Sequence, residues 1–159
     1  MRHLMPIVTP RLVLRPPTLD DLDAIQAAKE DAWNDLQLWM AWAFDNQRSR
    51  QAMEQSIRRV MDFQSQAGIA LAGFHRINGD FVVRTALELT GEADVYETGY
   101  WVAPKYAGQG MATEAANAAF VTRSATSAQG RSASGTSTAT TLAAASWRNW
   151  DFGSFAPPV

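Results

Sequence analysis

Short apolar runs separated by turn residues recur through the middle of the chain, and they predict a meander of strands. Gly68 to Phe74 and Phe81 to Leu89 are rich in apolar and β-branched residues, which favour strands. Asn78-Gly79 lies between these runs and is the dipeptide that a type I′ hairpin turn prefers, because that turn needs positive φ. A third run, Val95 to Val102, is aromatic and β-branched and predicts the next strand.

The N-terminal segment predicts one strand followed by a helix. Arg11 to Arg15 alternates between polar and apolar residues and is closed by two prolines, so it predicts a strand with Leu12 and Leu14 on one face. Thr18 to Asp21 offers an N-cap and acidic side chains for a first helical turn, and apolar residues at helical spacing follow. We expect the two arginines of the strand, which flank a sheet edge, to be solvated.

Two segments between residues 36 and 66 have helical or near-helical spacing. Leu36 to Phe44 is the most apolar stretch and carries three large aromatic side chains, which suit either the wall of a substrate pocket or a packed core helix. Arg48 to Gln66 is amphipathic and predicts a second helix. We expect Arg58 and Arg59 to lie on the solvated face of that helix.

A strand, a glycine loop and a helix start follow one another between residues 97 and 119. Pro104 ends the strand, because proline cannot donate to the ladder of a sheet. Gly108 and Gly110 leave the loop backbone bare, so a ligand can approach its N–H groups closely. Met111 to Ala119 is rich in helix formers. This order predicts an anion site, because free N–H groups and the positive end of the helix dipole face the same point.

Two common phosphate-binding motifs do not fit this loop. No Gly-Lys-Ser or Gly-Lys-Thr occurs, which excludes a P-loop, and the glycine spacing is not the G-x-G-x-x-G of dinucleotide-binding folds. A plain strand, turn and helix with no ligand is the alternative to an anion site.

The loop and its flanks resemble the GNAT superfamily of N-acetyltransferases, whose pyrophosphate loop reads Q/R-x-x-G-x-G/A. In that register Ala107 takes the Gln/Arg position, Gly110 the central glycine and Ala112 the closing small residue. The family's E-x-G-Y-W-V-x-P strand and A-T-E-A helix start are both present, beginning at Glu97 and at Ala112. The opening T-x-R-L-x-L-R-P-P-x-x-x-D, which begins at Thr9, resembles the RimJ/RimL-like branch, the ribosomal-protein-alanine acetyltransferase type.

The resemblance implies an acetyl-CoA site on this segment and no metal. The pyrophosphate is expected on Gly108 to Ala112, and the pantetheine is expected to pair like a strand with Tyr100 to Val102. Ala107 lacks the side-chain contact of a Gln or Arg but keeps the backbone donors of the loop. The expected cofactor-binding residues are Tyr100, Trp101, Val102, Ala107, Gly108, Gln109, Gly110, Met111, Ala112 and Thr113.

The resemblance also implies direct transfer of the acetyl group to an amine, either a protein N-terminus or a small molecule. The thioester carbonyl is expected to accept a hydrogen bond from a backbone N–H of the strand, which stabilises the developing oxyanion. Glu97 is the expected base, because the amine must be neutral to attack, and a rim or core-pairing carboxylate is its alternative role. Trp39, Met40 and Trp42 are expected to line the acceptor pocket. The family's general acid, usually a tyrosine, belongs to the C-terminal third and is not assigned.

Composition narrows the remaining classes of function. A chain of 159 residues fits one domain with a real core, and its net charge of -2 gives no bulk positive field for nucleic acid or an anionic membrane. There is no cysteine, hence no disulfide framework and no thiolate nucleophile. No signal peptide or membrane-length apolar run is recognised, so we expect a soluble cytoplasmic protein. The oligomeric state is not set by the sequence.

The C-terminal segment departs from the pattern before it. Val121 to Ser146 is almost wholly Ser, Thr, Ala and Gly, and no acidic residue occurs between Glu114 and Asp151. With no hydrophobic period, it is expected to be disordered, where the family places its last strands and helix. The expected fold class is therefore α/β (α+β), a GNAT-type mixed, mostly antiparallel sheet flanked by helices. Residues 9–120 are expected to form part of an acetyltransferase domain and 121–159 a low-complexity tail.

We hypothesise that a change of reading frame after about Ala118 replaced the native C-terminal third with this tail. When codons are read from their third base, Trp147 to Asp151 ends in Leu-Gly-Leu or Leu-Gly-Phe whatever codons are used, in register with other family-like residues. A true low-complexity tail is the alternative. Two functions follow for the chain: an N-acetyltransferase, or a non-catalytic remnant that binds acyl-CoA weakly or associates with a partner.

Overall fold

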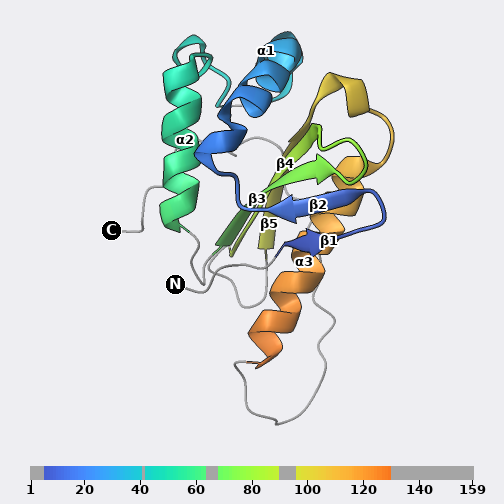
Figure 1. The fold of residues 1–159 in the computed structure, drawn as a ribbon. Coiled ribbons are helices and arrows are strands. Elements are labelled where there is room, and N and C mark those ends of the chain that lie inside the picture. Colours follow the sequence, from blue (N-terminus) through green and yellow to red (C-terminus); the bar gives the residue numbers. More distant parts are fainter. Residues whose placement is uncertain (1–5, 41, 64–67, 90–95, 130–159) are drawn as a thin grey trace.

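The computed structural model describes residues 6–40, 42–63, 68–89 and 96–129, which form a sheet covered by helices. The strands are β1 (Ile7–Val8), β2 (Leu12–Arg15), β3 (Gly68–His75), β4 (Phe81–Leu89) and β5 (Tyr96–Val102). The helices are α1 (Leu22–Trp39), α2 (Arg50–Phe63) and α3 (Met111–Gln129), with short 3-10 turns η1 (Leu19–Asp21), η2 (Asp45–Gln47) and η3 (Pro104–Tyr106). Helices α1 and α2 lie on one side of the sheet and α3 on the other (Figure 1).

The described sheet follows chain order, β1-β2-β3-β4-β5, and every neighbouring pair is antiparallel. The expected α/β class, a mostly antiparallel sheet flanked by helices, is confirmed. Strand β5 is the outermost described strand on its side of the sheet. The predicted tail from residue 130 onward lies outside the described residues. None of the described helices combines the length and the apolarity needed to cross a bilayer.

Element boundaries follow the sequence pattern closely where an apolar run is long. The strand expected over Phe81 to Leu89 is confirmed, and the helix expected over Arg48 to Gln66 runs from Arg50 to Phe63. Strand β1 was not expected, because two residues are too few to show a period. Helix α3 continues past Ala119, so residues 121–129, which were expected to be disordered, are helical. Alanine favours a helix even where no apolar period exists.

The hairpin between β3 and β4 forms where Asn78-Gly79 predicted it, but its turn is longer than type I′. His75 N–H donates to Asp80 C=O at 2.8 Å, and Gly79 N–H donates to His75 C=O at 2.9 Å. The loop therefore comprises residues 76–79, and Gly79 takes the positive φ of 74°. Asn78 contributes through its side chain instead, since its Oδ1 accepts from Asp80 N–H at 3.0 Å.

The strand register assigns residues to the two faces of the sheet. Arg15, Ala72, Arg84 and Trp101 are successive cross-strand partners, so they form one row on one face. Arg84 and Trp101 line a cavity together with Lys29 of α1, so this row faces α1 and α2. The prediction that Arg15 is solvated is wrong, because its guanidinium lies 4.3 Å from the centre of a phenylalanine ring and pairs with a carboxylate of η1.

The neighbouring row lies on the other face and is so close-packed that its middle position requires glycine. Leu14, Gly73 and Val83 are cross-strand partners in this row. A Cβ at Gly73 would lie 2.6 Å from Val83 Cγ1 and 2.7 Å from Leu14 Cδ2, which is closer than carbon atoms pack. A larger residue at position 73 would push the strands apart.

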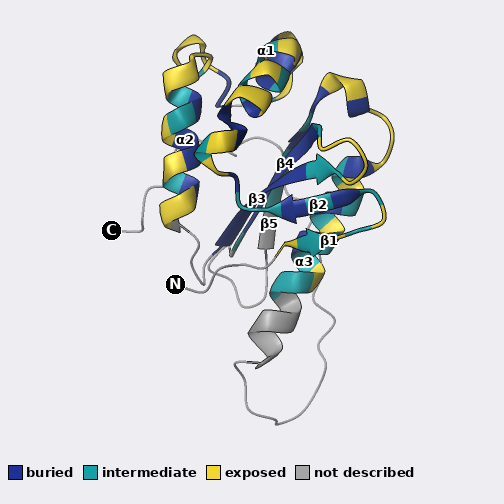
Figure 2. Ribbon diagram, viewed as in Figure 1, coloured by how far each residue is buried: buried dark blue, intermediate teal, exposed yellow. Residues whose placement is uncertain are grey.

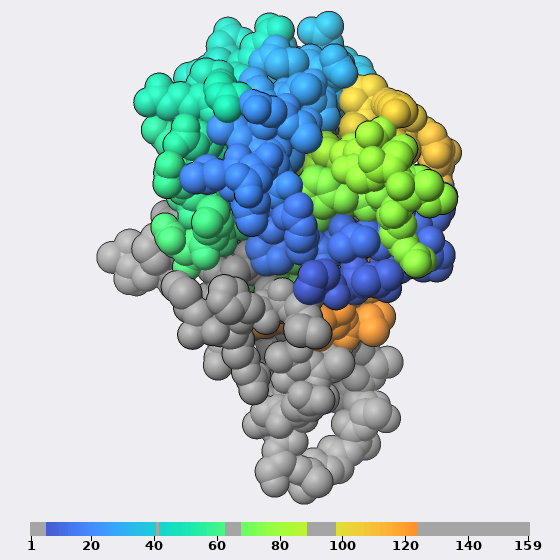
Figure 3. Space-filling model, in the orientation of Figure 1, coloured from blue at the N-terminus to red at the C-terminus, as the bar shows by residue number. Residues whose placement is uncertain are grey.

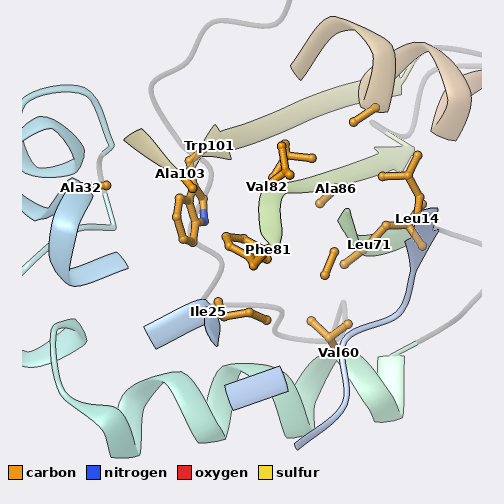
Figure 4. Close-up of a cluster of buried hydrophobic side chains, with 14 of the residues drawn as sticks. Leu14, Ile25, Ala32, Val60, Leu71, Phe81, Val82, Ala86, Trp101 and Ala103 are labelled. Atoms are coloured by element: carbon orange, nitrogen blue, oxygen red, sulfur yellow. The ribbon is translucent and has the colours of Figure 1, made fainter. Parts of the chain in front are cut away.

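The core between the helices and the sheet is built on the apolar stripe that predicted α1. Ile25 of α1 points from its helix toward Phe81 of the sheet, and Val60 of α2 points toward the sheet near Leu71 (Figure 4). The Phe81 and Trp101 rings are 5.3 Å apart between centroids. The outer surfaces of both helices are exposed, whereas the strands are largely buried (Figure 2). Each large apolar side chain buried in this way contributes about 1.5–3 kcal/mol to folding.

Candidate functional site

The loop that joins β5 to α3 is held open by two glycines. Its first turn is η3, where Tyr106 N–H donates to Ala103 C=O at 2.9 Å. Gly108 and Gly110 follow with φ of 71° and 76°, in the left-handed region that favours glycine. A Cβ at Gly108 would meet nothing within 4 Å, so this glycine is required by the backbone conformation and the space above it is open.

The N-terminal end of α3 faces this open loop. The first hydrogen bond of the helix runs from Glu114 N–H to Gly110 C=O at 3.1 Å. The N–H groups of Met111 to Thr113 therefore precede the helical ladder and point out of the helix end. Together with the bare backbone at Gly108, they supply the donors and the dipole field that favour an anion at a helix end. The structure thus brings together the predicted loop residues Ala107, Gly108, Gln109, Gly110, Met111, Ala112 and Thr113.

Arg11 ties this loop to the N-terminal hairpin. Its Nη1 donates to Gln109 C=O at 2.7 Å, and its Nε lies 2.7 Å from Glu114 Oε2. The backbone N–H of Arg11 and the hydroxyl of Thr9 both donate to Glu114 Oε1, at 2.9 and 2.6 Å. The Arg11 side chain is 41% exposed, so it is solvated in part as predicted, but its pairing with Glu114 was not predicted. The sequence held one indication of this pairing. Arg11 belongs to the opening motif, and Glu114 is the Glu of the A-T-E-A helix start.

The carboxylate of Glu114 is stabilised in its charged form. Burial raises its pKa, but hydrogen bonds from Thr9 and from the backbone and side chain of Arg11 outweigh this effect, so the pKa lies below its usual value. A negative charge in the first turn of α3 is favourable toward the helix dipole. Arg11 pairs with this carboxylate and offsets its negative charge. The Glu114 carboxylate should therefore repel an anion at the loop only weakly.

A second set of contacts ties η3 to the β3–β4 hairpin. Tyr106 Oη donates to Asp80 Oδ2 at 2.8 Å and accepts from Asn78 Nδ2 at 3.0 Å, while Lys105 Nζ lies 2.6 Å from the same Asp80 oxygen. The Tyr106 ring also stacks on His75 with 5.6 Å between centroids. Figure 3 shows the two segments side by side at the surface. The glycine loop is therefore anchored at both of its ends.

The hydrogen-bond pattern of β5 shows which backbone groups face its outer edge. Ala103 N–H donates to Val82 C=O at 2.8 Å, so this pair is hydrogen-bonded across the strands. Pairs alternate along an antiparallel ladder, so Trp101 also bonds to β4, and the backbone groups of Tyr100 and Val102 point away from β4. Tyr100 and Val102 are two of the three residues, Tyr100 to Val102, that were expected to pair with a pantetheine, whereas the backbone of Trp101 faces β4.

The predicted acceptor residues are only partly brought together. Trp42 is buried and lines a cavity with Trp101 of β5. Trp39 ends α1 and is 72% exposed, and Met40 is half-buried. Glu97 lies on β5 opposite Glu88 of β4, and the placement of the Glu97 side chain lies outside what the structure describes.

Two buried cations that the sequence analysis did not treat as site residues line the same cavity, whose volume is about 20 Å³. Lys29 and Arg84 are each only 1% exposed. Burial lowers the pKa of Lys29 to about 8, and nearby Arg84 adds to this effect while Glu30 opposes it. Burial likewise lowers the pKa of Arg84 to about 10. The sequence contains one indication of each cation. Lys29 interrupts the apolar stripe of a predicted helix, and Arg84 lies in the middle of a predicted strand.

Comparison with known proteins relates the chain to a family of acetyltransferases, some of which have solved structures with bound coenzyme A or acetyl-CoA. Residues 11–149 match the family described as the acetyltransferase (GNAT) domain, while no curated protein matches the sequence. Among solved structures, a candidate ribosomal-protein-serine acetyltransferase from Vibrio cholerae is 25% identical, with a TM-score of 0.67 over 80% of this chain and 71% of that one.

Two further solved structures share the fold at lower identity. RimL, a ribosomal L7/L12 α-N-protein acetyltransferase in complex with coenzyme A, is 16% identical, with a TM-score of 0.65 over 74% of this chain and 67% of that one. The microcin C7 self-immunity acetyltransferase MccE, in complex with acetyl-CoA and AMP, is 16% identical, with a TM-score of 0.63 over 75% and 65%. The chain thus spans about two thirds of the length of these two proteins.

Proposed function

Because the chain belongs to the GNAT acetyltransferase family, we propose that it moves an acetyl group from acetyl-CoA to a primary amine, on a protein N-terminus or a small molecule. The observation that carries this proposal is the continuity of β5, the glycine loop and the start of α3. Positive φ at Gly108 and Gly110 opens the loop, and the N–H groups of Met111 to Thr113 point out of the helix end.

The pyrophosphate of acetyl-CoA is proposed to bind at this loop. Backbone N–H groups from Gly108 to Thr113 supply the donors, and the helix dipole adds a favourable field. Ala107 and Gln109 flank these donors. Arg11 supports the site by holding Gln109 C=O and Glu114, which fixes the loop relative to the helix.

The pantetheine is proposed to lie along the outer edge of β5. The backbone groups of Tyr100 and Val102 point toward this edge, which supports strand-like pairing with the amides of the pantetheine. A backbone N–H of β5 donates to the thioester carbonyl and stabilises the negative charge that develops on its oxygen. Bound acetyl-CoA supplies the activated acyl group and the thiolate leaving group.

The acceptor amine is proposed to approach from the side of the sheet that faces α1 and α2. Trp42 and Trp101 line one cavity on that face, which supports an aromatic wall there, and Trp39 and Met40 are proposed to extend this wall. Glu97 is proposed as the base that removes a proton from the ammonium form of the acceptor, because only the neutral amine attacks.

A non-catalytic, acyl-CoA-binding remnant is the second candidate. It is favoured by the position of β5, which is the outermost strand of the described sheet where a two-sided cleft would need a further strand. The test begins with calorimetric titration of acetyl-CoA into the purified full chain. Release of CoA thiol is then measured with small amines and with peptides that begin with Ser or Ala. Binding with turnover supports the enzyme, binding alone supports the remnant, and no binding contradicts both.

A further inference from the structure

A groove separates the first half of α1 from the β3–β4 hairpin and η3. Its volume is about 400 Å³, within the range of roughly 300–1,000 Å³ that is usual for ligand sites. Helix α1 lines it with Ala24, Ala27, Ala28 and Asp31, and the hairpin and η3 line it with residues 78–81 and 103–106. None of these residues belongs to the glycine loop or to β5, so the groove is separate from the proposed acetyl-CoA site.

The wall formed by α1 is apolar for most of its length and ends in one carboxylate. Ala24, Ala27 and Ala28 are spaced by three and four positions, so their methyl groups lie on one face of the helix. Asp31 lies about one turn further along the same face. A long side chain can therefore lie with its stem against the methyl groups and its head at Asp31.

The opposite wall carries two charges that offset each other. Lys105 Nζ lies 2.6 Å from Asp80 Oδ2, and Tyr106 Oη donates to the same oxygen at 2.8 Å. The hydrogen bond from Lys105 holds the pKa of Asp80 below its usual value, and the same contact raises the pKa of Lys105. This wall therefore adds no net charge to the groove.

The carboxylate of Asp31 is the charge of the groove that is not offset. Asp31 is exposed and forms no hydrogen bond or ion pair with any residue that the structure describes. Asp23 and Glu30 of the same helix, in contrast, are paired with arginines. The groove thus offers one negative charge at the end of an apolar wall. This combination favours a cation on an apolar stem, which is the chemistry of arginine and lysine side chains.

We propose that this groove binds an arginine or lysine side chain of the polypeptide that carries the acceptor amine. The proposal rests on the proposed acetyl-transfer function, and it selects a polypeptide acceptor over a small amine. The position of the groove supports it, because Phe81 lines the groove and its ring centroid lies 5.3 Å from that of Trp101, on the side from which the acceptor is proposed to approach. The stem of the bound side chain packs on the alanines, and its cation pairs with Asp31.

The direct test is amide NMR of the purified full chain with N-acetyl-arginine amide, which carries one positive charge and has no amine to be acetylated. We expect saturable shifts of the amides of Ala27, Ala28 and Gly79. N-acetyl-norleucine amide has an apolar stem without the charge, and it should bind at least roughly threefold more weakly, as expected for the loss of one partly solvated ion pair. Equal binding of the two compounds, or shifts outside the groove only, would overturn the proposal.

Matched variants locate the partner of the cation. Asp31→Asn keeps the shape of the side chain but removes its charge, so we expect capped arginine to bind this variant no more tightly than capped norleucine does. Asp35→Asn removes an exposed carboxylate one turn further along α1 that does not line the groove, and it should leave binding unchanged. A folded Asp31→Asn protein that binds capped arginine as tightly as the unchanged chain would contradict the assignment.

The link to acetyl transfer is tested with peptides that begin with Ser or Ala and carry one arginine at successive positions, against the same peptides with norleucine. At one of these positions arginine should lower KM by roughly threefold, and Asp31→Asn should remove this difference. If turnover does not depend on the arginine at any position, the groove does not bind the acceptor. If no peptide is acetylated, the proposed function fails, whereas the result with capped arginine still decides whether the groove binds a basic side chain.

Discussion

Arg11 and Glu114 lie 103 positions apart in the sequence and meet beside the glycine loop, with 2.7 Å between Arg11 Nε and Glu114 Oε2. The same guanidinium donates to Gln109 C=O at 2.7 Å. One side chain thus fixes the loop backbone and the first turn of α3 relative to each other. The geometry of the anion site therefore depends on the first hairpin of the chain, far from the loop in sequence.

Replacing Arg11 should loosen the loop and weaken acetyl-CoA binding. Arg11→Met removes both contacts but keeps an apolar stem, and we expect affinity to fall by roughly fivefold, equivalent to about 1 kcal/mol for one partly exposed charged hydrogen-bond network. Calorimetry measures this change. Arg76→Met is the matched control, because the Arg76 guanidinium donates to the carbonyls of Thr9 and Pro10 in the same hairpin rather than to the glycine loop. If Arg11→Met binds acetyl-CoA as tightly as the unchanged chain does, the contacts of Arg11 with Gln109 and Glu114 do not contribute to binding.

An acidic side chain at Gly110 should weaken acetyl-CoA binding more strongly. Gly110 has φ of 76°, and a Cβ there would lie 3.6 Å from Arg11 Nη2. Gly110→Asp therefore strains the backbone, adds negative charge beside the pyrophosphate and competes with Glu114 for Arg11. We expect at least roughly a tenfold loss of affinity, which is about 1.4 kcal/mol.

The matched control for this variant is Gly79→Asp. Gly79 has a similar φ of 74° and open space around its Cα, but it lies in the β3–β4 hairpin. It should cost stability through the same backbone strain while leaving acetyl-CoA affinity near its original value. Similar affinity losses in both variants would indicate general unfolding and would count against the loop assignment.

Restoring an arginine at position 107 should tighten binding. Ala107 is exposed and takes the position where the family pattern has Gln or Arg. Ala107→Arg adds one charge-assisted hydrogen bond to the pyrophosphate, and we expect roughly threefold to tenfold higher affinity. Ala107→Leu is the size-matched control without charge. If the arginine gives no gain over leucine, the register of the motif along the loop is wrong.

The sequence specified the strands, helices and loop well because their patterns are local. Strand β4 is predicted by its apolar run, and the loop before α3 is predicted by its proline and glycines. Both predictions depend only on residues that are neighbours in the sequence. The type of turn at Asn78-Gly79 could not be predicted in this way. Hydrogen bonds between His75, Gly79 and Asp80 set a longer loop than the dipeptide alone indicates.

The contacts that build the site were harder to predict because they join distant segments. Arg11 was expected in solvent, and only the packing of the first hairpin against α3 reveals its pairing with Glu114. Lys29 and Arg84 share a cavity because the register places Arg84 beside Trp101 and α1 crosses that face. The sequence pattern shows that these charged residues interrupt apolar runs. It does not show that they line the same cavity.

Stability should increase with pH between about 8 and 10.5, and Lys29 is the residue responsible. Burial lowers its pKa from 10.5 to about 8 in the folded chain. Between these values the unfolded chain binds more protons than the folded one, so the free energy of unfolding rises with pH. Below about pH 8 the residue is protonated in both states and adds no slope.

Urea denaturation across pH 7–10.5 measures this slope in the unchanged chain and in Lys29→Met. Other titrating groups are common to both proteins, including Glu30 and Arg84 beside the site, so the difference between the two curves isolates Lys29. The variant should show a flatter profile. Parallel profiles would mean that the Lys29 ammonium is as well solvated in the folded chain as in the unfolded one.

The final prediction concerns residues 130–159, which the structure does not describe. This segment is rich in Ser, Thr, Ala and Gly and offers few β-branched hydrophobic residues other than threonine, so it is a poor partner for the outer edge of β5. We expect amides from residues 130 to 146 to exchange with solvent within seconds and the chain to turn over acetyl-CoA slowly. A strand edge that the tail fails to cover favours association, so we expect light scattering to show aggregates at high concentration.

The decisive variant restores the alternative reading frame from about Ala118 onward. If a frame change removed the native C-terminal third, this variant should gain amide protection, stay monodisperse and raise the rate of CoA thiol release by at least roughly tenfold. A control with the present tail in shuffled order keeps its length and composition and should behave like the unchanged chain. Strong protection of residues 130–146 in the unchanged chain, together with ordinary turnover, would instead show that the present tail packs against β5 and completes the site.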